Sequence, residues 1–402
     1  MQARSFYLRW GGLFCIACGL SWSHSLISVG VGALGLGYIL SWGSRPLLKA
    51  VERPILFLTL PFILLYLLHA LSWFYTEDTG QWWVEMRVKA PLLFLLPASV
   101  MAWRESPVSI RKGIHSIFHL SLLIVGIGTL FRFWTDPTAA LETIRHGRYV
   151  PMMGGISHIY YAGLVGIAFF FLWTLPFWGG ENLKWVIAGI YFAILHILAL
   201  RTGLVALYGT AFFLLLRWGV KKPRRWPWII LFIGLGMGFV HLLICHLPPL
   251  RQRWENFRTD LAQYKPGRYI THTSVTRRLA ALEASWRVFR EHPWIGVGIA
   301  DNEVAVFQEI PRLPYRWDKE GYILPHNQFV EYAVGLGAIG VGVFLLFWIG
   351  AFRQHLGGQW VGWLFYWLLL LQGEAFLERQ VGLTAFLWGT ALMWVELNAR
   401  KS

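Results

Sequence analysis

Long apolar runs separated by short polar breaks recur along the whole chain. The stretch LPHNQFVEYAVGLGAIGVGVFLLFWI, residues 324–349, shows the pattern: a polar start and then a run of mainly apolar residues. A helix of about 20 such residues crosses the hydrocarbon core of a bilayer, so each run predicts a membrane-spanning helix. We predict about twelve spans, at residues 6–23, 25–42, 54–74, 83–102, 113–134, 157–176, 183–200, 203–218, 226–245, 326–350, 359–376 and 381–397.

One long hydrophilic interval, His246–Pro325, divides the chain into three parts. Residues 1–245 carry the first nine predicted spans, and residues 326–402 carry the last three and a C-terminal tail. Inside the interval, SVTRRLAALEASWRVFRE places apolar residues at helical spacing, which predicts an amphipathic helix against the membrane surface or the helix bundle. A surface helix with scattered charges is the alternative. The apolar positions are Val275, Leu279, Leu282, Trp286 and Phe289.

Composition supports a polytopic all-α membrane protein. The chain is 56% hydrophobic and 14% charged, whereas a soluble domain is about 25% charged. Its 24 Trp and 15 Tyr suit two aromatic belts at the membrane surfaces. The net charge of +15 therefore indicates membrane lipids with phosphate headgroups as partners, and we expect no binding of nucleic acid.

The distribution of cations predicts the orientation. With both termini in the cytoplasm, cytoplasmic segments collect most Lys and Arg of the short loops, as the positive-inside rule requires. The long interval 246–325 then faces outward. The cytoplasmic cations are Arg4, Arg9, Arg45, Lys49, Arg53, Arg104, Arg111, Lys112, Lys184, Lys221, Lys222, Arg224, Arg225, Arg353, Arg400 and Lys401.

Several cations remain on the predicted outer side, where the rule disfavours them. Arg145 and Arg148 follow the fifth predicted span, and Arg201 stands in a tight turn between two apolar runs. A guanidinium bonds two phosphate oxygens at once and keeps its charge, so we predict an outward anion site at the bilayer edge. The alternative is that these side chains reach the lipid headgroups, which we favour for Arg87 and Lys89.

Nucleotide and metal sites are not indicated. No Walker sequence occurs. The outer carboxylates form no DxD pair and no cluster with histidines, so arginines instead of a metal ion would neutralise a phosphate ligand. We expect no metal and no cofactor.

Three stretches together resemble bacterial O-antigen ligases of the WaaL type. His326 and Asn327, nine further residues, and then Gly337 and Gly340 are similar to the H-[NSQ]-x9-G-x-x-[GTY] pattern of that family. Arg278 followed by EHPWIGVG resembles the Arg and P-x-x-G-V-G block of the wider O-antigen ligase and polymerase superfamily. LRTGLVAL resembles its S-R-x-x-L-L-A-L stretch, although Val205 stands where a strict pattern has leucine.

The resemblance implies a fold like that of the GT-C glycosyltransferases, with about twelve membrane helices and a large periplasmic loop. It implies an O-antigen ligase in the inner membrane of a Gram-negative bacterium, with its active site facing the periplasm. Such an enzyme transfers O-antigen glycan from undecaprenyl diphosphate to the terminal sugar of lipid A–core during lipopolysaccharide synthesis. It needs no nucleotide and no metal.

The mechanism implied by the resemblance uses the outer cations and the histidine. Arg145, Arg148, Arg201 and Arg278 would bind the diphosphate, on which negative charge grows as the sugar leaves. His326, with an ordinary pKa of about 6.5, would be the general base for the acceptor hydroxyl, and direct displacement would invert the anomeric centre. The alternatives are that His326 binds the phosphate or that its role is purely structural.

Further residues would support this site. Asn327 and Gln328 would orient the substrate or the imidazole, and Arg87 and Lys89 would add supporting contacts. Gly337 and Gly340 would let another span approach closely and so fix the helix that begins at His326.

Two other functions stay open. An O-antigen polymerase would use the same donor with a lipid-linked acceptor. A transporter of lipid-linked sugars is the weaker alternative, because the charges gather at one face and no internal repeat is evident. The sequence does not determine the oligomeric state.

Overall fold

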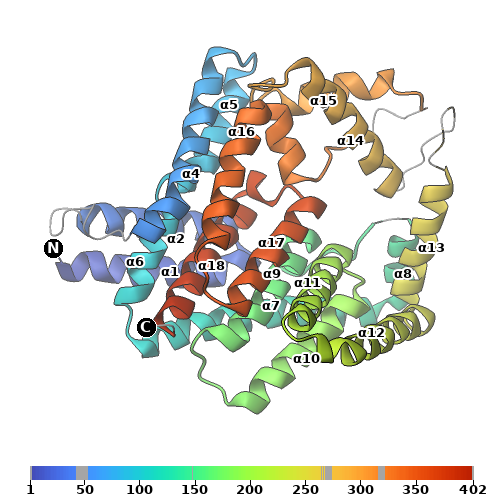
Figure 1. Cartoon of the computed structure of the whole chain (residues 1–402), viewed down its shortest axis with the longest axis horizontal. Helices are drawn as coiled ribbons and strands as arrows, with labels where there is room; N and C mark the ends of the chain where they lie inside the picture. The colour runs from blue at the N-terminus through green and yellow to red at the C-terminus, as the bar shows by residue number, and fades with distance from the viewer. Residues whose placement is uncertain are drawn as a thin grey trace.

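The computed structural model describes residues 2–41, 53–146, 148–263, 265, 267, 274–315 and 322–400. These residues form helices joined by turns and short extended segments, and they contain no strand (Figure 1). Arg45, Lys49 and Lys401, three of the cations used to predict the orientation, lie outside them. The all-helical architecture agrees with the prediction.

Each of the twelve predicted spans is helical where the structure describes it. Seven helical segments of this part of the chain are long and apolar enough to cross a membrane. They are α2 (His24–Ser41), α4 with η2 (Arg53–Leu71 and Ser72–Phe74), α5 to α6 (Thr79–Lys89, η3 Ala90–Leu93 and Leu95–Glu105), α7 (Val108–Thr135), α11 (Arg201–Val220), α12 (Trp226–His246) and α16 (Gln328–Phe352). The other five are shorter or less apolar: α1 (Gln2–Trp22), α9 (His158–Thr174), α10 (Glu181–Ile197), α17 (Gly358–Gly373) and α18 (Gln380–Ala399).

Helix α18 lies at the centre of the hydrophobic core. Nearly all of its residues are buried, and it contacts α6, α9 and α2. Its Trp388 packs against Phe171 of α9 and Phe118 of α7, with ring centroids 5.6 and 5.7 Å apart. Buried aromatic side chains thus join the helices around α18.

Helix α16 is folded back on itself at Gly337, which differs from the single straight span predicted from residue 326. Gly337 has φ +64° and ψ −164°, outside the helical region. The rings of Phe329 and Phe344 lie 5.2 Å apart, although 15 residues of straight helix would separate them by about 22 Å. The part before Gly337 and the part after it are therefore two antiparallel helices (Figure 1), and His326 directly precedes the N-cap residue of the first.

The segment Pro293–Gly298 closes this turn. Carbonyls of Val334 and Gly335 accept from the backbone amides of Val297 and Gly298 at 2.9 and 3.0 Å. The amide of Ala338 donates to Pro293 at 2.8 Å, and that of Ile339 to Trp294 at 3.2 Å. Backbone N–H and C=O groups that lose their helical hydrogen bonds at the break are therefore bonded to this segment. Such groups need a partner where water does not reach them.

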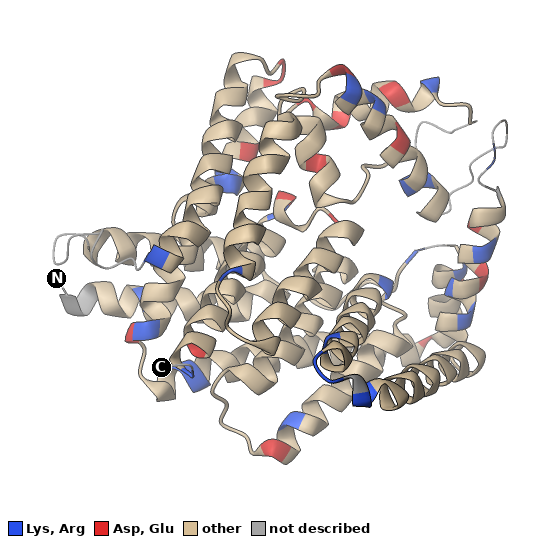
Figure 2. Cartoon of the chain, viewed as in Figure 1, with Lys and Arg blue, Asp and Glu red and all other residues tan. Residues whose placement is uncertain are grey.

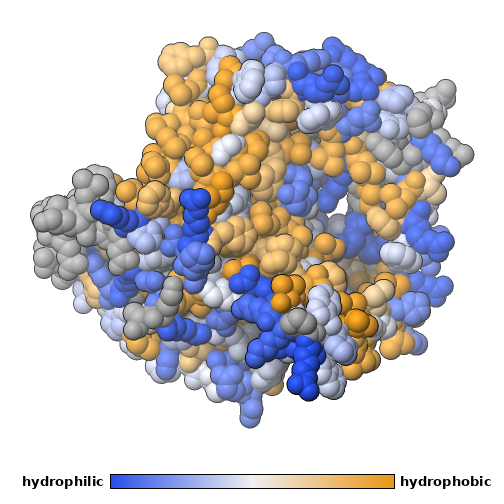
Figure 3. Space-filling model, viewed as in Figure 1, coloured by the Kyte–Doolittle hydropathy of each residue, from blue (hydrophilic) through white to orange (hydrophobic). Residues whose placement is uncertain are grey.

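The described residues between α12 and His326 include the helices α13 (Pro248–Gln263), α14 (Ser274–Glu291) and α15 (Asn302–Glu309) and the 3-10 helix η5 (Ile310–Arg312). The predicted helix at 274–291 is present, but its packed face differs from the predicted one. Ala280, Ala284 and Val288 are buried in a core shared with α15 and the first part of α16, whereas Trp286 is 59% exposed. Small side chains let α14 approach its neighbours, and hydrophilic residues gather over α14 and α15 (Figure 3).

Candidate active site

His326 faces a carboxylate that comes from the turn between α17 and α18. Its Nδ1 lies 2.9 and 3.0 Å from the two carboxylate oxygens of Glu374. A carboxylate can only accept, so Nδ1 donates, and in the neutral imidazole this leaves the lone pair on Nε2. His326 has φ +51°, a left-handed conformation that is rare for a residue other than glycine and is common at functional sites.

The two residues after His326 hold the backbone. The side-chain oxygen of Asn327 caps α16 by accepting from the amides of Phe329 and Val330 at 3.0 and 3.2 Å. Gln328 is fully buried and bonds the next turn of the chain: its Nε2 donates to Glu378 at 2.5 Å, and its Oε1 accepts from the Leu377 amide at 2.7 Å. Both amides thus fix the histidine's segment against the turn that carries Glu374.

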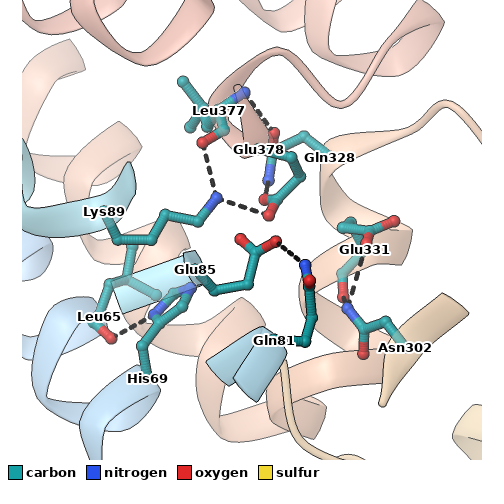
Figure 4. Close-up of polar contacts among 10 residues, drawn as sticks. All are labelled: Leu65, His69, Gln81, Glu85, Lys89, Asn302, Gln328, Glu331, Leu377 and Glu378. Carbon is teal, nitrogen blue, oxygen red and sulfur yellow. Dashed lines mark hydrogen bonds and ion pairs between the residues drawn. The ribbon is translucent and has the colours of Figure 1, made fainter. Parts of the chain in front are cut away.

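Lys89 of α5 contacts the same turn, at Leu377 and Glu378 (Figure 4). Its ammonium group, fully buried, donates to the Leu377 carbonyl at 2.7 Å and to Glu378 at 2.5 Å. Burial raises the pKa of Glu378, but Lys89 lowers it more, so that the carboxyl has a pKa below its ordinary value. Lys89 therefore holds the turn at residues 377–378, instead of reaching lipid headgroups as the sequence led us to favour.

Arg278 connects the histidine pair to a cluster of cations. From α14 it donates to the Gly373 carbonyl at 3.1 Å, and its Nη2 lies 3.9 Å from Glu374. Burial lowers the pKa of Arg278 and Glu374 opposes that effect, with Tyr149 as a second, weaker partner. A guanidinium is not deprotonated in proteins, so Arg278 stays charged at neutral pH.

Tyr149 stands at the centre of the cation cluster. Its hydroxyl accepts from Nε and Nη2 of Arg201 at 3.3 and 3.1 Å. The guanidinium of Arg253 lies 3.9 Å from the centre of its ring, and the imidazole of His158 stacks on it at 3.5 Å. The turn that delivers Arg201 contains Ala199 at φ +48°, again a left-handed residue that is not glycine.

This cluster carries an excess of positive charge in a buried place. Burial raises the pKa of Tyr149, but Arg201 and Arg253 together outweigh it, so the phenol has a pKa below its ordinary value of 10. Among the described residues, Nε2 of His158 and Nε of Arg253 are buried without a hydrogen-bond partner. Unpaired donors beside three guanidinium groups are suited to an anion.

Other cations predicted for the site lie at its edge or apart from it. Arg145 pairs with Glu142 of α8 (Pro137–Arg145) at 3.7 Å and its side chain is 69% exposed. Arg148 is exposed, and its backbone carbonyl accepts from Arg253. Arg87 is exposed on α5 and bonds only its own helix, at the Trp83 carbonyl.

The two glycines of the histidine motif serve the turn in α16. A side chain at Gly337 would overlap the backbone of Trp294 and Ile295, so the neighbour that approaches it is a loop, and not another span. A side chain at Gly340 would meet Leu336, which lies across the turn.

Sequence reasoning did not find Glu374, Tyr149, His158 or Arg253 as members of this site. Glu374 is the first acidic residue after the predicted eleventh span begins, but its distance of 48 residues from His326 hides the pair. His158 and Arg253 belong to none of the three motifs that indicated the site. Figure 2 shows where the basic and acidic residues lie along the helices and loops.

A separate cleft of about 500 Å³ opens between the α4–α5 turn and the segment 292–308. Tyr75, Glu77, Trp294 and Gln308 are among its lining residues, and His326 is not. The paired titratable groups and the buried cations lie at the His326 site, so we place the chemistry there.

The arrangement can perform two tasks side by side. Nε2 of His326 can take a proton, with Glu374 stabilising the imidazolium that forms. Arg201, Arg253 and Arg278 can neutralise a phosphate or diphosphate held next to it.

A model of a known protein family matches part of the chain. Residues 186–345 match the family model described as O-antigen ligase, which covers Arg201, Arg253, Arg278 and His326 but less than half of the chain. No curated protein matches the chain. The match and the apolar helices support a membrane glycosyltransferase of the O-antigen ligase and polymerase superfamily, acting on lipid-linked sugars.

Proposed function

We propose that this protein is an O-antigen ligase. It transfers O-antigen glycan from undecaprenyl diphosphate to the terminal sugar of lipid A–core, at the periplasmic face of a Gram-negative inner membrane. One observation carries the proposal: Arg278 links the His326–Glu374 pair to a cluster of buried and half-buried arginines around Tyr149. A base beside a diphosphate site is the minimum that this transfer needs.

The arginines act on the leaving group. When the bond between the anomeric carbon and the phosphate oxygen breaks, the electron pair remains on the diphosphate. Fixed cations in a dry site stabilise that charge without reorganising, which lowers the barrier. Arg253 is buried and Arg201 and Arg278 are half-buried, and the exposed Arg145 and Arg148 stay candidates for outer contacts with the same group.

His326 acts on the acceptor. Its Nε2 takes the proton of the sugar hydroxyl as that oxygen attacks the anomeric carbon, and Glu374 holds the imidazole in the tautomer that leaves Nε2 free. Attack opposite to the diphosphate inverts the anomeric configuration. No step uses a nucleotide or a metal ion.

The topology that we propose puts this site at the outer surface. Both termini lie in the cytoplasm, and α13, α14 and α15 cover the site from the periplasm. The twelve predicted segments would cross the membrane, with the first half of α16 as a re-entrant helix that returns at Gly337.

An O-antigen polymerase is the alternative, because the matched family model supports ligases and polymerases alike. Deletion in the native bacterium separates the two. Loss of a ligase leaves lipid A–core without any O-antigen while lipid-linked glycan accumulates, and loss of a polymerase leaves lipid A–core with a single repeat unit. We expect the first pattern, restored by the wild-type chain and not by His326→Ala. The single-unit pattern would instead establish a polymerase.

A further inference from the structure

Tyr149 has one hydrogen-bonding group that the fold leaves unused. Its phenolic oxygen accepts two hydrogen bonds, both from Arg201, at 3.3 and 3.1 Å. With both lone pairs engaged, its remaining capacity is the O–H donor. That hydrogen meets no acceptor among the described residues.

The ring of Tyr149 is fixed from both faces. His158 stacks on it with ring planes 18° apart, and Arg253, itself only 3% exposed, lies over it. Two bonds to Arg201 set the rotation of the hydroxyl. A donor held this rigidly needs little reorganisation when an acceptor arrives.

The surroundings select the kind of acceptor. Arg201, Arg253 and Arg278 all act electrostatically on Tyr149, and the buried nitrogens of His158 and Arg253 also lack partners. Each of these groups favours a negatively charged oxygen in front of the phenol. A neutral sugar hydroxyl would accept weaker hydrogen bonds from these groups than a charged phosphate oxygen would.

We propose that Tyr149 is a catalytic residue, whose hydroxyl donates a hydrogen bond to the diphosphate oxygen that leaves the sugar; this role rests on the proposed function. As the bond between that oxygen and the anomeric carbon breaks, its electron pair stays on the diphosphate and strengthens the hydrogen bond from Tyr149. The acceptor oxygen forms the new bond to carbon, and its proton passes to Nε2 of His326. The phenol keeps its own proton.

The test is transfer kinetics of Tyr149→Phe in purified enzyme with undecaprenyl-diphosphate glycan and lipid A–core. Phenylalanine keeps the stack and the contact with Arg253 and removes only the hydroxyl. We expect kcat to fall about 10²-fold with little change in the KM for the donor. Tyr208→Phe is the matched control, because its hydroxyl bonds His196 at 2.8 Å, outside the cluster, and its kcat should stay at the wild-type value.

Two outcomes overturn the assignment: an unchanged kcat in Tyr149→Phe, or a higher KM with kcat intact. If Tyr149→Phe lost thermal stability, the enzyme with 2,3-difluorotyrosine at position 149 would be tested in its place. The hydroxyl of this residue is more acidic than that of tyrosine, so the fall of kcat at alkaline pH should move to lower pH. An unshifted fall would then count against a role of the hydroxyl. Failure of the proposed function has a different signature, because the wild-type enzyme itself would then make no product.

Discussion

His326 and Glu374 form a hydrogen-bonded pair, 2.9 Å from Nδ1 to a carboxylate oxygen, across two segments 48 residues apart. Because Glu374 selects the tautomer, its loss should act through His326. We expect His326→Ala to reduce kcat by about 10²–10⁴-fold and Glu374→Gln to reduce it less, with the KM of both substrates nearly unchanged. Steady-state transfer kinetics check both. Full activity in His326→Ala would remove the base from the mechanism.

The turn in α16 should depend on Gly337. Alanine at φ +64° would be strained by about 1–3 kcal/mol, and its methyl group would overlap the Trp294 backbone, so Gly337→Ala should lower the free energy of unfolding by at least that amount. Gly342→Ala is the control, since its methyl group would enter open space and favour the helix by up to about 1 kcal/mol. Unfolding in detergent measures both. Equal stabilities would contradict the fold-back.

Lys89 should stabilise the turn beneath Glu374. Lys89→Met leaves the Glu378 carboxylate unpaired, at a cost of about 3 kcal/mol, the low end for a broken buried pair because the Glu378 side chain keeps 22% exposure. Removing the charge as well, in Lys89→Met with Glu378→Gln, should recover part of that loss. The exposed Arg87→Met should change stability by less than about 0.5 kcal/mol. A double variant no more stable than Lys89→Met would argue against the pair.

The activity should depend on the planar guanidinium of Arg201 and not only on its positive charge. Lysine cannot make two parallel bonds to the Tyr149 hydroxyl, so Arg201→Lys loses a charge-assisted contact of about 1.5–3 kcal/mol and kcat/KM should fall at least about tenfold. Arg251→Lys, at an exposed ion pair with Glu255, is the control. If lysine served equally well at position 201, charge alone would suffice there.

Stability should depend on pH through Tyr149. Burial raises the pKa of Tyr149, but Arg201 and the other arginines lower it by more. The native state therefore stabilises the phenolate relative to the unfolded state. A lowered pKa adds stability that is complete above the ordinary value of 10 and is lost as pH falls through the native pKa. The stability difference between wild type and Tyr149→Phe should therefore grow with pH in that range, with phenolate absorbance at 295 nm rising below pH 10. A difference that stayed constant would refute the shift.

Helices were predictable from the sequence because their signal is local. Apolar runs of membrane length gave all twelve helical segments, including α18 near the C-terminus. The histidine motif also indicated His326, which has a carboxylate partner and a left-handed backbone in the structure, and its role in catalysis stays a prediction.

The turn at Gly337 was not predictable, because its residues are as apolar as a straight span. The turn is evident only from φ +64° at Gly337 and from the backbone hydrogen bonds to Pro293–Gly298. Those bonds join the histidine motif to the EHPWIGVG motif, which are separate in the sequence. Tyr149 and Glu374 were hidden for a similar reason. Their roles come from contacts with Arg201 and His326, tens of residues away, which no local pattern records.

The central claim is that the chain moves glycan from a lipid diphosphate by its own side chains. Purified protein in liposomes, with undecaprenyl-diphosphate glycan, lipid A–core and a chelator but no nucleotide, tests it most directly. We predict lipid A–core enlarged by the mass of the glycan, with undecaprenyl diphosphate released in equal amount, and neither product with His326→Ala. Unmodified lipid A–core, or glycan lengthened on its own lipid carrier, would contradict the account.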